Sequence, residues 1–166
     1  MTIDEFNALD AAAARESVAV WAGIPSWVET LVDGRPYGSV DELAKRAAAL
    51  ATTWTRADLD AAVAQHPRIG ARVTGENAEA AASRREQASM ADAAADVAAR
   101  IADGNAAYEA RFGRVFLIRA AGRSPEEMLA ELERRLGNDD DTEAREAVGQ
   151  LAEIALLRLR AAVTQG

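Results

Sequence analysis

Apolar residues recur at helical spacing over much of the chain. Towards the C-terminus they form one stripe, made of Val148, Leu151, Ala152, Ala155, Leu159 and Ala162. In the middle of the chain Ile101, Tyr108 and Phe112 repeat in the same way, interrupted only by Gly104. This periodicity is typical of amphipathic helices that turn one face towards a core. The pattern therefore predicts a long final helix and a long middle helix.

Polar residues indicate where further helices begin. A hydroxyl side chain followed three residues later by an acid is typical of a capping box. It occurs at residues 39–42, 55–58, 83–86, 89–92 and 124–127. The last is the clearest, because Pro125 stands at the first helical position. Glycine and proline mark helix ends at residues 23–25, 33–36, 66–67, 113 and 137–138.

These signals predict an all-α protein, a single-domain bundle of about seven to eight helices over residues 1–166. Residues 114–121, with the sequence RVFLIRAA, are the exception, because their composition would also suit a short strand. No second strong strand is available to pair with them. We therefore expect an extended or kinked connection between helices.

Composition supports helices and narrows the class of partner. Hydrophobic residues make up 49% of the chain, much of it alanine, whereas aromatic residues make up 5%. The net charge of −8, without a cluster of Lys and Arg free of nearby acids, argues against nucleic-acid binding. The absence of cysteine excludes disulfides and thiolate metal sites. An acidic N-terminus without a signal-peptide pattern, and no run of about 18 apolar residues, predict a cytoplasmic protein without membrane contact.

The sequence contains no pattern that is typical of a metal site. The acidic run at residues 138–143 lacks the glycine that a calcium loop needs at its sixth position, and is more simply a turn before a helix N-terminus. A zinc site would need three carboxylates around the only histidine, which would be unusual. We therefore expect no metal site.

The only histidine, His66, stands directly before Pro67. A helix that begins at Thr55 must end before this proline, whose ring disfavours a helical residue in front of it. His66 is therefore expected at a helix C-terminus, where the negative end of the helix dipole favours a protonated imidazole and thus a proton donor. The alternative is a histidine that only caps the helix.

Two further turns carry candidate binding groups. If Ser83 begins a helix, the turn offers backbone N–H groups, the Ser83 hydroxyl and the Gln87 amide to a polar substrate, with Glu86 as the acid–base partner of His66. The alternative is an ordinary capping box without a ligand. At residues 120–124, glycine permits close approach of the backbone and Arg123 would bind a carboxylate, unless that arginine is simply solvated.

Taken together, these stretches resemble the 2-oxo-4-hydroxy-4-carboxy-5-ureidoimidazoline (OHCU) decarboxylases. The resemblance rests on HPRIG at residues 66–70, SRREQA at 83–88, the run from 105 to 138, the segment 27–48 and EIALLRLR at 153–160. It implies an all-helical fold, usually dimeric and without a cofactor, that converts OHCU to (S)-allantoin and CO2. Such enzymes act after urate oxidase and hydroxyisourate hydrolase, so functional coupling to both is implied.

The resemblance also implies roles for individual residues. The catalytic histidine falls on His66 and its partner carboxylate on Glu86. Substrate contacts fall on Pro67, on the turn of residues 83–87 and on residues 118–122, while Phe116 suits an apolar wall and Arg123 an attraction for the anionic substrate. The expected substrate-binding set is Pro67, Ser83, Arg84, Arg85, Gln87, Phe116, Ile118, Arg119, Ala120, Ala121, Gly122 and Arg123.

Two features depart from the family pattern, GRV at residues 113–115, where the family often has bulkier or proline-containing sequence, and Arg119. Arg119 stands where a small or apolar residue is expected, and inside the pocket it could hold the substrate carboxylate and slow decarboxylation. This leaves two alternatives to an OHCU decarboxylase. One is a lyase for a related ureide or hydantoin-like acid, and the other is a catalytically silent helical dimer.

Overall fold

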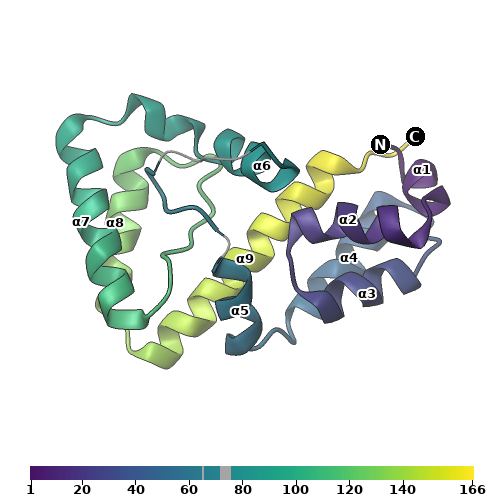
Figure 1. Ribbon diagram of the computed structural model, residues 1–166, viewed down its shortest axis with the longest axis horizontal. Coiled ribbons are helices and arrows are strands. Elements are labelled where there is room, and N and C mark those ends of the chain that lie inside the picture. The colour runs from purple at the N-terminus through teal and green to yellow at the C-terminus, as the bar shows by residue number, and fades with distance from the viewer. Residues whose placement is uncertain (65, 72–75) are drawn as a thin grey trace.

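The fold is described by a computed structural model that covers residues 1–64, 66–71 and 76–166. Within these residues the chain forms nine α-helices and one short 3-10 helix, and its β-type pairing is a single isolated bridge between Thr2 and Thr164. The prediction of an all-α protein is thus confirmed (Figure 1). The helices are α1 (Ile3–Ala8), α2 (Ala11–Trp21), α3 (Pro25–Asp33), α4 (Val40–Ala51), α5 (Arg56–Val63), α6 (Ala78–Glu86), η1 (Ala88–Asp92), α7 (Ala95–Phe112), α8 (Pro125–Arg135) and α9 (Asp140–Ala162).

Three of the predicted helix starts are confirmed by their caps. Ser39 begins α4, and Thr55 and Ser124 form complete capping boxes at α5 and α8. The short helix α1 has a capping box of its own, from Thr2, that the pattern did not single out. This is one reason why the helices exceed the predicted number.

Two predicted starts are wrong. Ser83 lies in the last turn of α6, which begins at the N-cap Asn77, and its side chain is 2% exposed. The second, Ser89, lies in the 3-10 helix η1, and its hydroxyl donates to the carbonyl of Arg123. A helix start needs an exposed cap with free N–H groups after it. In both cases tertiary contacts engage the serine instead.

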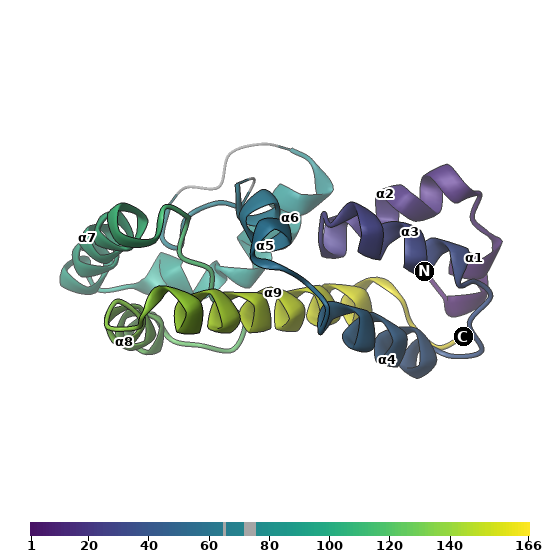
Figure 2. The same ribbon diagram turned by 90° about the horizontal axis from the view of Figure 1, so that it is seen from below.

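The buried apolar side chains form two clusters. The first core combines α1–α5 with α9, and the second core combines Ile69 with α7, α8 and part of the segment between them. Figure 2 shows α9 running along the length of the molecule, with α7 and α8 at one end and α1–α4 at the other. The predicted stripe on α9 lies against the first core, as expected. A site between the two cores can therefore draw on side chains from both.

The segment between α7 and α8 joins the cores, and it is an extended connection, as predicted. Successive side chains of extended backbone point in opposite directions. Accordingly Leu117 packs into the first core, whereas Phe116 and Ile118 pack into the second. The side chain of Arg135 fixes this arrangement by donating to the carbonyl of Leu117 at 2.7 Å.

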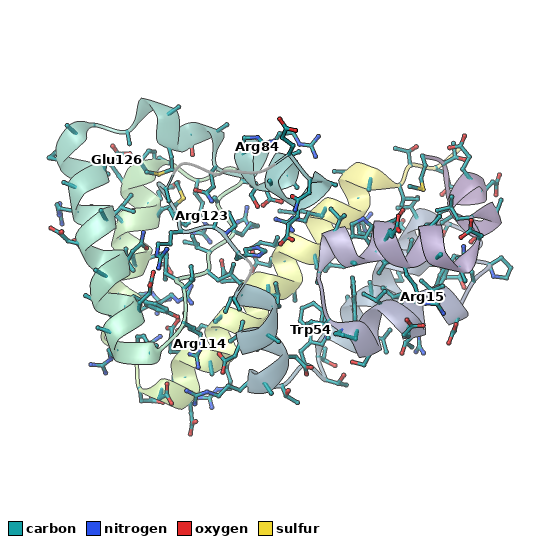
Figure 3. All side chains as sticks on the ribbon, in the orientation of Figure 1. Arg15, Trp54, Arg84, Arg114, Arg123 and Glu126 are labelled. Atoms are coloured by element: carbon teal, nitrogen blue, oxygen red, sulfur yellow. The ribbon has the colours of Figure 1, made fainter. Side chains whose placement is uncertain are left out.

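An ion pair connects the first part of the same segment to α5. Arg114, at the lower edge of Figure 3, donates to Asp60 of α5 at 2.7 Å, and its side chain is 3% exposed. α5 leads directly into the turn of His66. The segment between α7 and α8 and the turn of His66 both border the candidate site. The ion pair between Arg114 and Asp60 links them from outside the site.

Gly104 provides a test of how tightly α7 packs against α8. A Cβ atom there would lie 2.6 Å from Cδ2 of Leu132, which is 1% exposed and cannot swing away. We expect Gly104→Ala to lower the free energy of unfolding by about 1 kcal/mol, because overpacking outweighs the gain in helix propensity. Gly149→Ala on α9, with open space around the new methyl group, should instead stabilise the protein by up to about 1 kcal/mol. Thermal unfolding of both variants checks the opposite signs, and two stabilised variants would contradict the packing.

Candidate active site

The turn that carries His66 follows α5. The backbone N–H of His66 donates to the carbonyl of Val63 at 3.0 Å, so the helix ends where Pro67 requires it to end. Further along, the buried Asn105 of α7 donates to the carbonyl of Ile69 at 2.9 Å. Gly70 has a φ of 78° and donates its N–H to Gln87 at 3.1 Å. The imidazole is therefore held on a turn fixed from two neighbouring elements.

His66 lines a small, partly open cavity at the junction of the two cores. The other lining residues are Pro67, Ile69, Ser83, Glu86, Gln87, Phe116, Leu117, Ile118, Ala120 and Ile154. For a water-sized sphere its volume is about 10 Å³, close to the space of one water molecule. Most of its wall is apolar, so a charged group that enters loses its hydration. Any ligand larger than water requires the walls to move apart.

Within this cavity the predicted pairing of His66 with Glu86 is not present. Nδ1 of His66 lies 3.4 Å from Oε1 of Glu79 in the first turn of α6, and both ring nitrogens are buried without a hydrogen bond to any described residue. The imidazole beside Glu79 holds the pKa of that carboxyl below its usual range, against the opposing effect of burial. Sequence reasoning did not select Glu79, because it began this helix at Ser83 and so left Glu79 outside it.

Glu86 is instead bound by Arg158 of α9. The guanidinium donates to both carboxylate oxygens, at 2.7 and 2.9 Å, and also to the Ser83 hydroxyl and the carbonyl of Val20. Arg158 is 6% exposed, and sequence reasoning did not select it. The available signal was a charged residue inside the apolar run of α9, where a solvated arginine would be out of place.

The structure brings together some of the predicted site residues and separates others. His66, Glu86, Pro67, Ser83, Gln87, Phe116, Ile118 and Ala120 line the cavity. Arg84 and Arg85 are exposed on α6, and Figure 3 shows Arg84 on its outer side. Arg85 and Ala121 line a larger groove of about 490 Å³ between α2, α6 and α9, which shares Glu86 with the cavity. The backbone N–H groups at residues 83–87 are not available to a substrate as expected, because this is a helix C-terminus, where N–H groups donate to carbonyls of the preceding turn.

Arg119 lies outside the cavity as well. Its guanidinium donates to Glu153 of α9 at 2.8 Å and to the carbonyl of Ala121 at 2.6 Å, and the side chain is about one-third exposed. Gly122, with a φ of 79°, and Arg123 belong to the following turn, and neither lines the cavity. The extended backbone explains this outcome, because it turns Arg119 away from the direction taken by its neighbour Ile118.

The described residues hold no cluster of three or more His, Asp or Glu side chains placed to bind a metal ion. In the same part of the chain, no helix combines the length and apolar character that crossing a bilayer demands. The chemistry available to the cavity is that of one imidazole, one fixed carboxylate, one amide and an apolar wall. Fold and site together define an all-helical protein with an imidazole and a fixed carboxylate around a small, mostly apolar cavity.

Comparison with known proteins identifies the family to which the chain belongs. A family model described as OHCU decarboxylase matches residues 7–160. A 2-oxo-4-hydroxy-4-carboxy-5-ureidoimidazoline decarboxylase of Amia calva is 33% identical over 129 residues, which are 76% of this chain and 74% of the relative. A protein of the same name from Haloferax volcanii is 30% identical over 164 residues, or 96% and 94% of the two chains.

The fold agrees with that assignment. A crystal structure of OHCU decarboxylase in the presence of (S)-allantoin matches with a TM-score of 0.75 at 24% sequence identity, and the match covers 88% of this chain and 96% of that chain. The chain therefore belongs to the OHCU decarboxylase family, a family of carboxy-lyases.

Proposed function

We propose that this protein decarboxylates OHCU to (S)-allantoin and CO2 in urate catabolism, without a cofactor and with His66 as the proton donor. The observation that carries the proposal is the cavity itself, where a single buried imidazole, with an Nε2 that no described residue bonds, faces an apolar wall and two polar side chains of α6. Membership in the family supports the reaction, and the geometry of the cavity supports His66 as the residue that transfers the proton.

The substrate explains why no cofactor is needed. In OHCU the carbon that carries the carboxylate also carries a hydroxyl group and adjoins a ring C=N bond. When the bond to the carboxylate breaks, its electron pair moves into this imine and CO2 leaves. The protein has to orient the carboxylate, remove its water and deliver a proton to one face of the ring. The face that receives the proton determines which enantiomer of allantoin forms.

The cavity provides groups for each of these tasks. Phe116, Leu117 and Ile118 form the apolar wall against which the carboxylate loses its water. Gln87 and Glu86 provide polar atoms for the ureido group and the ring amides. Because Arg158 holds both oxygens of Glu86, this carboxylate keeps a fixed direction and acts as an acceptor rather than as a direct partner of His66. In this proposal Glu86 assists the reaction by positioning the substrate.

A homodimer, functional coupling to urate oxidase and hydroxyisourate hydrolase, and a cytoplasmic location stay predictions from the sequence. So does the set of substrate contacts beyond the cavity lining. The alternative lyase for a related ureide acid had its support in an arginine inside the pocket, and the guanidinium of Arg119 contacts Glu153 of α9 instead.

The proposal is tested by generating OHCU in situ from urate with the two upstream enzymes and then adding the protein. We expect the absorbance of OHCU to decay faster in proportion to protein concentration, with one CO2 released per OHCU consumed. Decay at the spontaneous rate, with a correctly folded protein, would contradict the proposal. Decay without CO2 would indicate a different reaction on the same substrate.

Arg119→Ala provides a specific prediction from the observed geometry. Because the guanidinium contacts α9 and a backbone carbonyl rather than the cavity, we expect kcat/KM for OHCU to stay within about twofold of the wild type. Steady-state kinetics with OHCU measures this directly. A tenfold change in either direction would place Arg119 in the substrate pocket after all.

A further inference from the structure

A larger groove lies next to the small cavity. It has a volume of about 490 Å³ and lies between α2, α6 and α9, and Glu86 lines both spaces. Ala82 and Arg85 of α6 also line the groove, whereas Ser83 of the same helix lines the cavity. The last turn of α6 therefore has the cavity on one side and the groove on the other.

The sizes of the two spaces indicate a route for the substrate. The cavity has room for about one water molecule, whereas OHCU contains a five-membered ring, a carboxylate and a ureido group. The groove falls within the roughly 300–1,000 Å³ that small-molecule sites occupy. A molecule held in the groove would reach the cavity when the last turn of α6, with Glu86, moves aside.

The charges of the groove suit an anion. Its charged side chains are those of Arg85, Glu86 and Arg158. Arg158 binds both oxygens of Glu86, so these two charges cancel. Arg85 is exposed and forms no ion pair with any described residue, which leaves the groove with one uncompensated positive charge. Because the chain as a whole carries a net charge of −8, this charge attracts an anion that most of the surface repels.

A second space beside the cavity lacks this property. It is a pocket of about 300 Å³ between α7 and the turn of His66, and the residue that it shares with the cavity is the apolar Ile69. Its arginine, Arg68, donates to both carboxylate oxygens of Glu109, at 2.5 and 2.8 Å. The positive charge of Arg68 is therefore cancelled, and this pocket offers an anion less than the groove does.

We propose that OHCU enters through the groove and that Arg85 captures its carboxylate there before the substrate passes Glu86 into the cavity. This inference rests on the proposed function. It assigns to Arg85 a role in capture and not in the reaction, because decarboxylation takes place beside His66. An arginine that stayed bound to the carboxylate would stabilise the substrate more than the transition state and would slow the loss of CO2.

The charge of Arg85 is tested with Arg85→Gln and Arg85→Lys. We expect Arg85→Gln to lower kcat/KM for OHCU about three- to tenfold at low ionic strength, because one attractive charge is lost, with kcat within about twofold of the wild type. Lysine keeps the charge and should keep kcat/KM. At about 0.5 M salt the difference between Arg85→Gln and the wild type should largely disappear, because salt screens exposed charges. An Arg85→Gln variant with wild-type kcat/KM at low salt would overturn the inference.

Two further variants separate the groove from the rest of the surface. Arg68→Gln removes the same charge beside the second pocket, and Lys45→Gln removes it from the exposed side of α4. Both should keep kcat/KM within about twofold of the wild type. A loss in Arg68→Gln as large as that in Arg85→Gln would overturn the route through the groove. So would the same loss in Lys45→Gln, because net charge alone would then explain the effect.

The route itself is tested by filling the groove. Ala161 of α9 is exposed and lines the groove, so a tryptophan there fits without disturbing either core. We expect Ala161→Trp to lower kcat/KM at least about tenfold, whereas Ala49→Trp, at an exposed position of α4, should keep it. Wild-type kcat/KM in an Ala161→Trp variant with an unchanged melting temperature would overturn the inference.

A final readout does not depend on turnover. Hydantoin-5-acetate is a stable anion with a ring ureide and a carboxylate, and its binding can be followed by NMR. We expect it to shift the amide resonances of Ala82 and Ala161 in the wild type and much less in Arg85→Gln. Shifts that do not depend on Arg85 would overturn the inference. If the wild-type protein leaves OHCU untouched while these shifts depend on Arg85, the proposed function fails and the groove stands as a site for an anion.

Discussion

Replacing His66 with alanine is expected to lower kcat for OHCU by about 10²- to 10⁴-fold, the range that a general acid or base contributes. The imidazole is the only group of its kind in the chain, and it lies buried on the wall of the cavity. The remaining wall and Gln87 still bind substrate, so KM should change much less than kcat. Allantoin should then form slowly and as a racemate, which circular dichroism detects directly.

His66→Asn is the companion variant, because it keeps a polar side chain but has no group that titrates near neutral pH. It should be as inactive as His66→Ala, with an unchanged melting temperature. A kcat within tenfold of the wild type in either variant would exclude His66 as the proton donor. The family assignment would survive this result, whereas the proposed mechanism would not.

The largest effect on stability is expected from Glu143→Ala. Glu143 and Arg135 form an ion pair whose side chains are 0% and 1% exposed. Tyr108 and Asn138 also donate to this carboxylate, and Arg135 holds the carbonyl of Leu117 at 2.7 Å. Removing one partner leaves a buried charge without compensation, which costs about 3–5 kcal/mol. Urea unfolding should show a loss of that size in the free energy of unfolding.

Glu146→Ala is the matched control for this experiment. Glu146 lies one turn along the same helix and pairs with Arg134, but both side chains are about one-third to one-half exposed. Pairs of this kind contribute about 0–1 kcal/mol. Equal losses in the free energy of unfolding for the two variants would contradict the larger contribution expected of the buried pair. Arg135 of this pair also anchors Leu117, which lines the cavity. On heating, Glu143→Ala should therefore lose its activity on OHCU at a lower temperature than Glu146→Ala.

The sequence contained most of the helical architecture. Local signals were sufficient at Ser124 and Pro125 and at the end of α5 before Pro67, where covalent geometry and short-range hydrogen bonds decide the outcome. The sequence also predicted the extended course of residues 114–121. No single-residue signal indicated that this segment alternates between two cores, because the cores exist only after α7, α8 and α9 have packed.

The site was less predictable for a related reason. A serine followed by an acid three residues later reads as a helix start, yet at Ser83 burial against Arg158 places the same residues at a helix end. Because the predicted start at Ser83 left Glu79 outside the helix, the sequence did not indicate that this acid lies beside the imidazole. Arg158 comes from a segment 72 residues away from Glu86, beyond the reach of local pattern analysis.

If this cavity decarboxylates OHCU with control over the proton that reaches the ring, the allantoin that forms is a single enantiomer. The most direct measurement is circular dichroism of the allantoin formed when the wild-type protein acts on freshly generated OHCU. We expect rapid accumulation of the (S)-enantiomer, ahead of its formation in a reaction without the protein. Slow, racemic allantoin at the spontaneous rate would contradict it.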